Sequence, residues 1–388
     1  MLIQKGYKYR IYPNKEQRGK LARVFGCVRY VYNYFLTART DAYAKDKTSL
    51  TYTKTSAMLT ELKKDKDHLW LAEVDSMALQ EGLRDLDRAY QNFFRKNAAF
   101  PKYHGKHDDQ SYRTRNQGMG IRIEEGKLRL PTLGLLKIKL SRDPLANGGR
   151  ILNATVSMTK TGKYFVSLCV EEELVPKPGS GGMIGIDLGL KEFYTDSNGK
   201  TVDNPKPLAL YQKKLMREQR SLSRMIEANI KGYGPKRKPI FIKPISDCSN
   251  IQKQLVKIAK LHEKIANIRK DMQHKESLKL VNENQVIAVE TLNIRGMLKN
   301  HRLAKAISDA SWGSFVGMLE YKAFERGGQV IKVPAFFASS QTCSKCGFKN
   351  PKVKDLSVRR WICPCCGTSH ERDENAAVNI LRKALSCA

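Results

Sequence analysis

The chain has 388 residues, and 70 basic against 38 acidic side chains give it a formal net charge of +32. This length allows two to four domains with apolar cores, and the charge predicts a polyanionic partner. No apolar run approaches transmembrane length and the N-terminus lacks a signal-peptide core, which argues against membrane-spanning and secreted proteins.

The N-terminal part of the sequence predicts one strand followed by helices. Residues 4–12 alternate between apolar and polar side chains in strand fashion. Asn14 is a candidate helix cap, because Gln17 stands three residues later and completes a capping-box pattern. A second helical region, with two breaks, covers residues 54–97. We therefore expect a small helical lobe after the first strand.

The next part of the sequence predicts a β-rich domain. Residues 100–117 mix aromatic and basic side chains, which suits base stacking and phosphate contact, although a solvated loop covering neighbouring strands is an open alternative. With residues 4–12, five alternating runs predict a β-barrel. These runs are 120–124, 127–131, 135–140, 151–158 and 163–172. The Pro- and Gly-rich residues 176–182 predict a linker and the main domain boundary.

One apolar run contains a carboxylate. Residues 183–190 have the pattern of a buried strand entering a hairpin, with Asp187 in the middle. An aspartate in such a strand is costly unless it is paired, hydrogen-bonded or bound to a metal. A strand-end aspartate satisfied by backbone amides is the simplest interpretation. Two acids far from Asp187 in the sequence favour the interpretation in which Asp187 binds a metal.

These two acids stand where predicted elements end or begin. Glu290 closes the strand-like run 286–290, and Asp373 lies in the first turn of a predicted helix. We expect Asp187, Glu290 and Asp373 to converge at one edge of a sheet as an all-oxygen site for Mg²⁺ or Mn²⁺. Two ions roughly 3.5–4 Å apart would activate a water and stabilise the leaving oxygen of an in-line displacement.

The region between the first two acids predicts two basic helices, residues 208–227 and 251–279. Between them, residues 232–244 contain too many prolines for a helix and predict a basic loop. An amphipathic helix and a last strand at 330–333 follow Glu290. Trp312, at the start of that helix, is expected in the core in preference to a platform for a base.

Two cysteine pairs predict a zinc ribbon. Cys343-x2-Cys346 and Cys363-x2-Cys366, separated by sixteen residues, match the spacing of two knuckles around one tetrahedral zinc. Four thiolates leave no open position, so this zinc would be structural. Cys365 is taken as a non-ligand. Disulfide pairing is the minor alternative, since a reducing compartment is expected.

Three motifs carry a resemblance to a known family. They are G-I-D-L-G at 185–189, V-E-T-L-N-I-R-G-M at 289–297 and R-D-E-N-A-A-V-N-I at 372–380, with the ribbon between the second and the third. This arrangement resembles the RuvC-like nuclease, of RNase H fold, in the TnpB family. That family comprises transposon-associated, RNA-guided DNA endonucleases similar to compact type V CRISPR effectors. The resemblance covers nearly the whole chain.

The resemblance implies a multidomain fold of mixed α+β and α/β class. An N-terminal wedge β-barrel would contain an inserted helical recognition lobe, and a RuvC-like nuclease domain of RNase H fold would contain an inserted zinc ribbon. The implied bounds are 1–13 and 98–178 for the wedge, 14–97 for the lobe, 179–340 and 368–388 for the nuclease domain, and 341–367 for the ribbon.

The resemblance also implies a function. A guide RNA encoded in the flanking transposon end would pair with double-stranded target DNA beside a short motif read by the protein, and a Mg²⁺-dependent site would cut both strands. A monomer with one RNA, in a prokaryotic cytoplasm and nucleoid-associated when bound to DNA, is expected. The alternative is an RNA-guided DNA-binding or transposition accessory protein that does not cleave. A membrane-surface protein is the weaker competitor, because basic residues are spread along the chain.

Six side chains are candidate nucleic-acid contacts. Gln80 and Asn116 are of the types that read adenine, in stretches that match the family's DNA-facing regions, although each could equally be a surface amide. Arg372, directly before Asp373, is a candidate phosphate clamp. The other three candidates are Arg84, Arg113 and Arg295.

Overall fold

The computed structural model describes residues 1–174 and 181–386, and the chain divides into two units, Met1–Leu174 and Val175–Ala388. Of the predicted linker, residues 176–180 lie outside the described residues. Across the two described ranges, no helix is both long enough and apolar enough to cross a membrane.

The predicted N-terminal strand lies at the centre of the sheet in the first unit. This sheet has the strand order β2-β6-β7-β1-β5-β4-β3, and its pairings are antiparallel. Tyr7, Tyr9 and Ile11 of β1 point into the core at every second position, as strand geometry requires. The strands are β1 (Leu2–Tyr12), β2 (Gln110–Arg115), β3 (Arg122–Glu124), β4 (Lys127–Leu130), β5 (Gly134–Lys139), β6 (Arg150–Met158) and β7 (Tyr164–Glu173).

One expectation for this sheet needs correction. In the described residues the edge strands β2 and β3 do not pair with each other, so the sheet is open where a β-barrel was predicted. Helices α1 and α3 pack against β2. Part of the aromatic and basic segment 100–117 is strand β2, because Tyr112 and Thr114 alternate into the core, so the alternative of a solvated loop does not hold for these residues.

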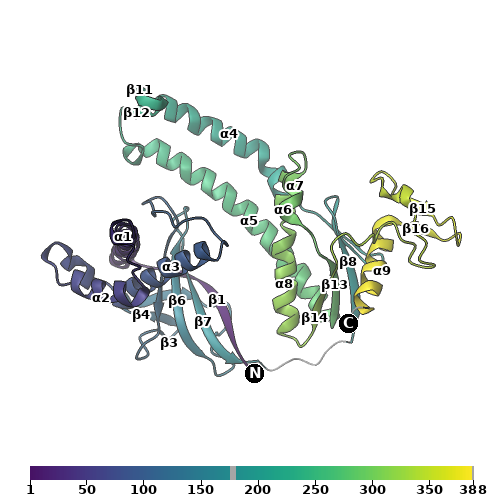
Figure 1. Ribbon diagram of the computed structural model, residues 1–388, viewed down its shortest axis with the longest axis horizontal. Coiled ribbons are helices and arrows are strands. Elements are labelled where there is room, and N and C mark those ends of the chain that lie inside the picture. The colour runs from purple at the N-terminus through teal and green to yellow at the C-terminus, as the bar shows by residue number, and fades with distance from the viewer. Residues whose placement is uncertain (175–180, 387–388) are drawn as a thin grey trace. The chain divides into compact units, whose positions relative to one another are not determined.

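The helices of the first unit lie between β1 and β2 in the sequence (Figure 1). The capping box is confirmed: the Asn14 side chain accepts from the Gln17 backbone at 2.8 Å, and the Gln17 side chain accepts from the Asn14 backbone at 3.0 Å. The helices are α1 (Lys15–Asp46), α2 (Tyr52–Leu62), the 3-10 helix η1 (Lys66–Glu73) and α3 (Ser76–Phe94). The two breaks predicted in the second helical region are present.

The second unit contains a mixed five-stranded sheet in the order β10-β9-β8-β13-β14. Strand β13 runs parallel to both β8 and β14, whereas β8, β9 and β10 form an antiparallel meander. The strands are β8 (Met183–Leu188), β9 (Glu192–Asp196), β10 (Thr201–Asp203), β13 (Val286–Glu290) and β14 (Gln329–Val333).

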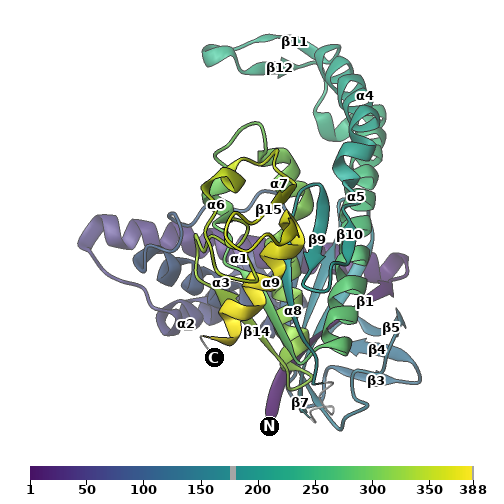
Figure 2. The same cartoon turned by 90° about the vertical axis from the view of Figure 1, so that its right-hand side faces the viewer.

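Helices cover both faces of this sheet (Figures 1 and 2). Ile287 and Val289 of β13 pack into the core with α5 (Ser249–Glu283) and α8 (Trp312–Phe324), whereas Ala288 packs towards α9 (Arg372–Leu385). This alternation explains why β13 is apolar from Val286 to Val289, since strands covered on both faces have no polar side. Trp312 is 3% exposed, which confirms its place in the core.

A long helical hairpin extends from the second unit (Figure 2). It is formed by α4 (Pro207–Glu227) and α5, and its far end carries the short strands β11 (Ile230–Tyr233) and β12 (Pro239–Phe241). The predicted basic loop is therefore partly a β-hairpin. The remaining elements are η2 (Pro235–Arg237), η3 (Ile245–Asp247), α6 (Ile294–Met297), α7 (Ala304–Ala310), η4 (Pro351–Lys354), β15 (Arg360–Ile362) and β16 (Ser369–Glu371).

Candidate functional site

The three predicted acids lie on neighbouring elements of the second unit. Asp187 is near the end of β8 and Glu290 is the last residue of β13, and the parallel register pairs Ile186 with Val289 immediately before them. Asp373 lies in the first turn of α9, which packs against both strands. Parallel pairing and helix packing thus bring all three to one edge of the sheet.

Helix α9 comes unusually close to β8 at Gly185. A Cβ atom at this position would lie 2.2 Å from the backbone oxygen of Ala377, which is a severe steric clash. Glycine is needed here because of this close approach between two backbones. The small residues on both elements therefore fix how near the start of α9, and with it Asp373, lies to the end of β8.

The acids influence one another electrostatically. Asp187 keeps partial solvent access, yet burial by the surrounding protein raises its pKa well above the ordinary value, and repulsion from Glu290 and then Asp373 raises the pKa further. Arg372 and Arg359 act in the opposite direction. The site thus concentrates negative charge in a place where water cannot screen it fully.

Two of the carboxylates are already engaged. Ser339 Oγ donates to Glu290 at 2.6 Å, and the Arg359 guanidinium lies 3.4 and 3.5 Å from the two oxygens of Asp373. Within the described ranges, the ribbon cysteines form the one group of three or more ligating side chains whose ligand atoms all lie within 4.8 Å of one another. The three carboxylates are not drawn together that tightly.

Two asparagines on α9 hold the segment that supports this site, and sequence reasoning gave them no role. Asn379 donates to the backbone oxygens of Ser339 and Thr342 at 2.8 and 2.6 Å, and Asn375 donates to Thr342 at 2.8 Å. Both are at least nine-tenths buried. Their spacing of four residues within R-D-E-N-A-A-V-N-I, which places both side chains on one side of the helix, was the available signal.

The expected phosphate clamp needs correction. Arg372 is 8% exposed and donates to the backbone oxygen of Asp355 at 2.6 Å, so it fastens the ribbon loop and does not face solvent. The exposed guanidinium beside Asp373 belongs to Arg359 of the ribbon. Arg372 is the first residue of α9, and at this position the Arg372 side chain turns inward. The Asp373 side chain, one residue later, stays partly exposed.

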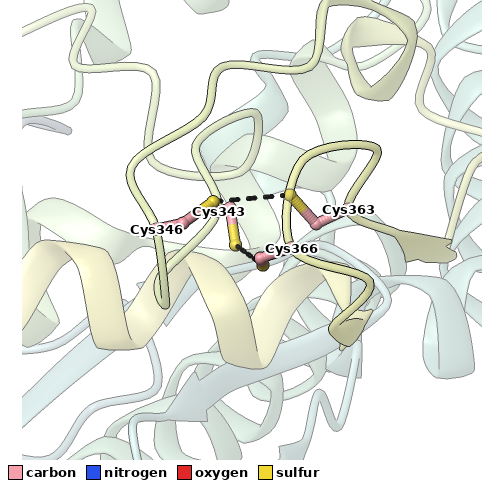
Figure 3. Close-up of side chains that lie close together, drawn as sticks. All are labelled: Cys343, Cys346, Cys363 and Cys366. Carbon is pink, nitrogen blue, oxygen red and sulfur yellow. Dashed lines mark hydrogen bonds between the residues drawn. The ribbon is translucent and has the colours of Figure 1, made fainter.

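The four predicted zinc ligands meet at one point (Figure 3). The Sγ atoms of Cys343 and Cys366 lie 3.6 Å apart, as do those of Cys346 and Cys363. Hydrogen bonds from the Thr368 side chain and backbone lower the pKa of Cys366 to about 6, which favours the thiolate. The set fits a tetrahedral zinc, since ligands of such an ion are separated by about this distance.

A fifth residue supports the thiolates. His370 Nε2 lies 3.0 Å from Cys343 Sγ, and the imidazole packs on Trp361 with ring centroids 4.7 Å apart. In the tautomer with its proton on Nε2, His370 donates to the sulfur, as residues next to metal ligands commonly do. Cys365 is exposed and outside the four-cysteine group, in agreement with its expected role as a non-ligand.

The nucleic-acid candidates in the first unit surround a buried carboxylate. Glu81 is 2% exposed, and Arg84 and Arg113 lie 3.3 and 3.6 Å from it. Arg115, from the aromatic and basic segment 100–117, lies 2.6 Å from the same carboxylate. Gln80 is the preceding residue on α3 and is partly exposed. We call Arg84, Arg113 and Arg115 the guanidinium cluster.

Asn116 and Arg295 differ in their freedom to bind a partner. The Asn116 amide donates to the backbone oxygens of Ile121 and Ile151 at 3.0 and 2.9 Å and accepts from the Ile121 backbone at 2.8 Å. This structural role argues against the expected base contact, because the side chain already uses both ends of its amide. Arg295 lies exposed on α6, beyond the end of β13.

Three family descriptions match parts of this chain. Residues 167–301 match "Probable transposase", residues 312–380 match "Cas12f1-like, TNB domain", and residues 1–48 match "Helix-turn-helix domain". The second match includes the ribbon and the third motif, R-D-E-N-A-A-V-N-I at 372–380.

Relatives of this chain match over nearly its full length. A Streptomyces pristinaespiralis protein named "Putative RNA-guided DNA endonuclease" is 37% identical over 100% of this chain and 90% of its own length. The Escherichia coli K12 protein InsQ, with the same description, is 32% identical over 97% of this chain and 91% of its own length. The solved structure of Cas12f1 in a complex with sgRNA and target DNA also matches. The match covers 98% of this chain and 98% of the Cas12f1 chain, with 15% identity and a TM-score of 0.50. That likeness extends to the fold alone.

Proposed function

The chain belongs to the TnpB family, and from this premise we propose that it is an RNA-guided, metal-dependent DNA endonuclease of transposon origin. Relatives that match nearly the whole chain carry this activity in their names, which supports the proposal. A guide RNA encoded in the flanking transposon end pairs with double-stranded target DNA beside a short motif that the protein reads. The nuclease site hydrolyses phosphodiester bonds of both strands.

The observation that carries this proposal is the charge around Asp187. Burial and repulsion from Glu290 and Asp373 both raise its pKa, so ionising all three acids together is unfavourable without a compensating cation. Carboxylate oxygens from three elements are the ligands that Mg²⁺ and Mn²⁺ prefer. The residues present therefore fit the two ions expected here, which when bound activate a water and stabilise the leaving oxygen.

The protein's own side chains prepare the site for this chemistry. Ser339 orients Glu290 through its 2.6 Å hydrogen bond, and Asn379 fixes Ser339 to α9. Arg359 neutralises Asp373 in the free protein and, being 53% exposed, can turn to a phosphate oxygen when nucleic acid arrives. Arg372 holds the ribbon loop that carries Arg359.

We assign the remaining parts of the chain in the same scheme. Residues 1–13 and 98–178 are assigned to the wedge, and residues 14–97 to the recognition lobe. Residues 179–340 and 368–388 form the RuvC-like nuclease domain, and residues 341–367 form the ribbon around one structural zinc. The charge of +32 supports a role for both units in binding RNA and DNA, with one RNA per monomer.

The proposal is tested with protein purified together with its guide RNA and supplied with Mg²⁺ and matching DNA. Asp187→Ala is expected to reduce cleavage to background while RNA retention stays near the wild-type level. Asp203→Ala, which removes an exposed acid from β10, is the matched control and should still cleave.

Other outcomes contradict the proposal. If Asp187→Ala loses RNA and cleavage together, Asp187 is structural. If wild-type protein retains RNA and binds matching DNA without cutting it, the non-cleaving alternative is correct. Absence of any discrete RNA in the purified protein would contradict RNA guidance itself.

A further inference from the structure

The helical part of the first unit contains a cavity that the proposed function does not use. Its volume is about 610 Å³, within the range of sites that bind small ligands. It lies between the end of α1, the segment that leads into α2, and the second half of α3. Its apolar lining consists mainly of aromatic rings: Tyr43, Tyr52, Tyr90, Phe93, Phe94 and Phe100.

Several of these rings are open to solvent. Phe94 is 73% exposed, Tyr43 is 58% exposed and Phe100 is 44% exposed. Tyr90 stacks near Phe94 with ring centroids 6.2 Å apart, and Phe100 meets Tyr90 edge to face at 5.7 Å. Such a cluster of exposed rings is costly in a free protein unless a flat apolar partner covers it.

The cavity also has a polar wall. Arg39 pairs with Asp87 at 2.8 Å, and Gln91 donates to the other oxygen of Asp87 at 2.9 Å. The Arg39 guanidinium lies 5.0 Å above the Tyr90 ring and is 92% buried, and its Nε has no hydrogen-bond partner among the described residues. A ligand with polar atoms at the edge of a flat ring would meet this polar wall, formed by Arg39, Asp87 and Gln91, as well as the aromatic one.

Positive charge lies beside the same cavity. Arg84 stacks on the Tyr52 ring at 4.2 Å, and Tyr52 lines the cavity. Through Glu81, Arg84 belongs to the guanidinium cluster with Arg113 and Arg115. A buried carboxylate that holds three partly exposed guanidinium groups fixes them for contact with phosphate.

We propose that this cavity binds one unpaired nucleobase, while the guanidinium cluster holds the phosphate of the same or the adjacent nucleotide. The flat rings provide stacking surfaces, the Arg39 wall provides hydrogen bonding at the base edge, and Arg84 connects the cavity to the phosphate contacts. A paired base is excluded, because its faces and its Watson–Crick edge are occupied in a duplex. The inference rests on the proposed function only in requiring that the chain bind nucleic acid.

The test uses the full-length protein without guide RNA or Mg²⁺ and photocrosslinks it to short oligonucleotides that carry a single 5-iodouracil. One oligonucleotide is single-stranded RNA, the second is single-stranded DNA, and the third is a duplex in which the iodouracil is paired. Peptide mapping by mass spectrometry is expected to place the adduct of a single-stranded probe on Tyr43, Tyr52 or Phe94. The arm that reacts identifies the base as RNA or DNA.

Two variants and one control decide the outcome. Phe94→Ala should lower the cavity adduct about 5-fold or more, the factor expected from losing one stacking contact. Ser49→Trp, which places a large ring on an exposed position of the cavity wall, should lower it as well. Phe336→Ala removes a ring that is 95% exposed in the second unit and should leave the adduct unchanged.

Four results would contradict the proposal. The proposal is wrong if neither single-stranded probe reacts in the cavity, if the paired probe reacts equally, or if Phe94→Ala keeps the full adduct. It is also wrong if sedimentation shows a dimer that Phe94→Ala dissociates, because the rings are then covered by a second copy. A protein that cleaves DNA under guide RNA but fails these tests contradicts this inference alone.

Discussion

The Arg359 guanidinium lies 3.4 Å from one carboxylate oxygen of Asp373 and 3.5 Å from the other, so a basic side chain of the ribbon neutralises an acid of the site. A divalent cation that binds Asp373 competes with this arginine. The two side chains are 53% and 40% exposed, and solvent therefore keeps the competition modest.

Removal of this arginine should tighten metal binding. We expect Arg359→Gln to lower the apparent dissociation constant for Mn²⁺ by about 2- to 5-fold in protein free of nucleic acid, as loss of an exposed ion pair implies. Calorimetric titration measures the change. Arg360→Gln is the control, because Arg360 pairs with Glu371 instead. Equal affinities in the two variants would show that Arg359 does not compete with the metal.

The histidine next to the ribbon thiolates should control zinc retention. His370→Phe keeps a ring against Trp361 but removes the nitrogen that lies 3.0 Å from Cys343 Sγ. We expect zinc affinity to fall by about 10-fold or more, the usual effect of losing a partner of a metal ligand. Competition with a chromophoric chelator measures it. Cys365→Ser should retain zinc as the wild type does, and loss of zinc in that variant would mean that the ligand set is different.

A methyl group at the contact between β8 and α9 should be poorly tolerated. Gly185→Ala would place Cβ 2.2 Å from the Ala377 oxygen, so the helix must move and we expect a loss of about 2 to 4 kcal/mol in the free energy of unfolding. Urea unfolding measures stability, and hydrogen exchange should rise in β8 and α9. Gly317→Ala is the control in the same unit, since no atom lies within 4 Å of the added Cβ. Wild-type stability of Gly185→Ala would contradict the packing described here.

Alkaline pH should stabilise the second unit through one buried lysine. Lys322 is 8% exposed and donates to the His274 backbone oxygen and to Ser277 Oγ, and burial lowers the pKa of Lys322 to about 8. Between about pH 8 and the ordinary lysine value near 10.4, the unfolded chain binds more protons at this site than the folded chain. The folded state therefore gains about 1 to 3 kcal/mol from this group as pH rises through that range.

Replacement of Lys322 tests whether this residue makes the folded state more stable as pH rises. In Lys322→Met the pH-dependent increment should vanish, which urea unfolding at a series of pH values would show as a flatter profile. Lys275→Met removes an exposed lysine from α5 and serves as the control. An unchanged profile in Lys322→Met would mean that this lysine titrates normally.

Local patterns were enough to predict the elements that carry the acids. Two apolar strands and an acidic first helical turn are each set by neighbours in the sequence, so β8, β13 and the start of α9 were expected where they are found. The convergence of Asp187 and Glu290 follows from parallel pairing. Whether these three acids hold metal stays a prediction.

Features that depend on distant partners were missed. Strand β2 has few apolar residues, and it is a strand because β6 pairs with it and α3 covers it. Arg372 and Arg359 could not be told apart by composition, because the inward turn of one depends on where α9 begins relative to the ribbon. Asn116 looked available for a base, yet the backbone of two other segments occupies its amide.

The order of elements also determines when the acid site becomes complete during protein synthesis. A ribosome makes Asp187 on β8 and Glu290 on β13 first, whereas the third carboxylate arrives with α9, after the ribbon. A nascent polypeptide that has emerged only as far as β14 has two acids and an uncovered sheet face. The site of three carboxylates therefore cannot form on a partly translated protein. Truncation anywhere before Asp373 removes the third carboxylate and leaves the site incomplete.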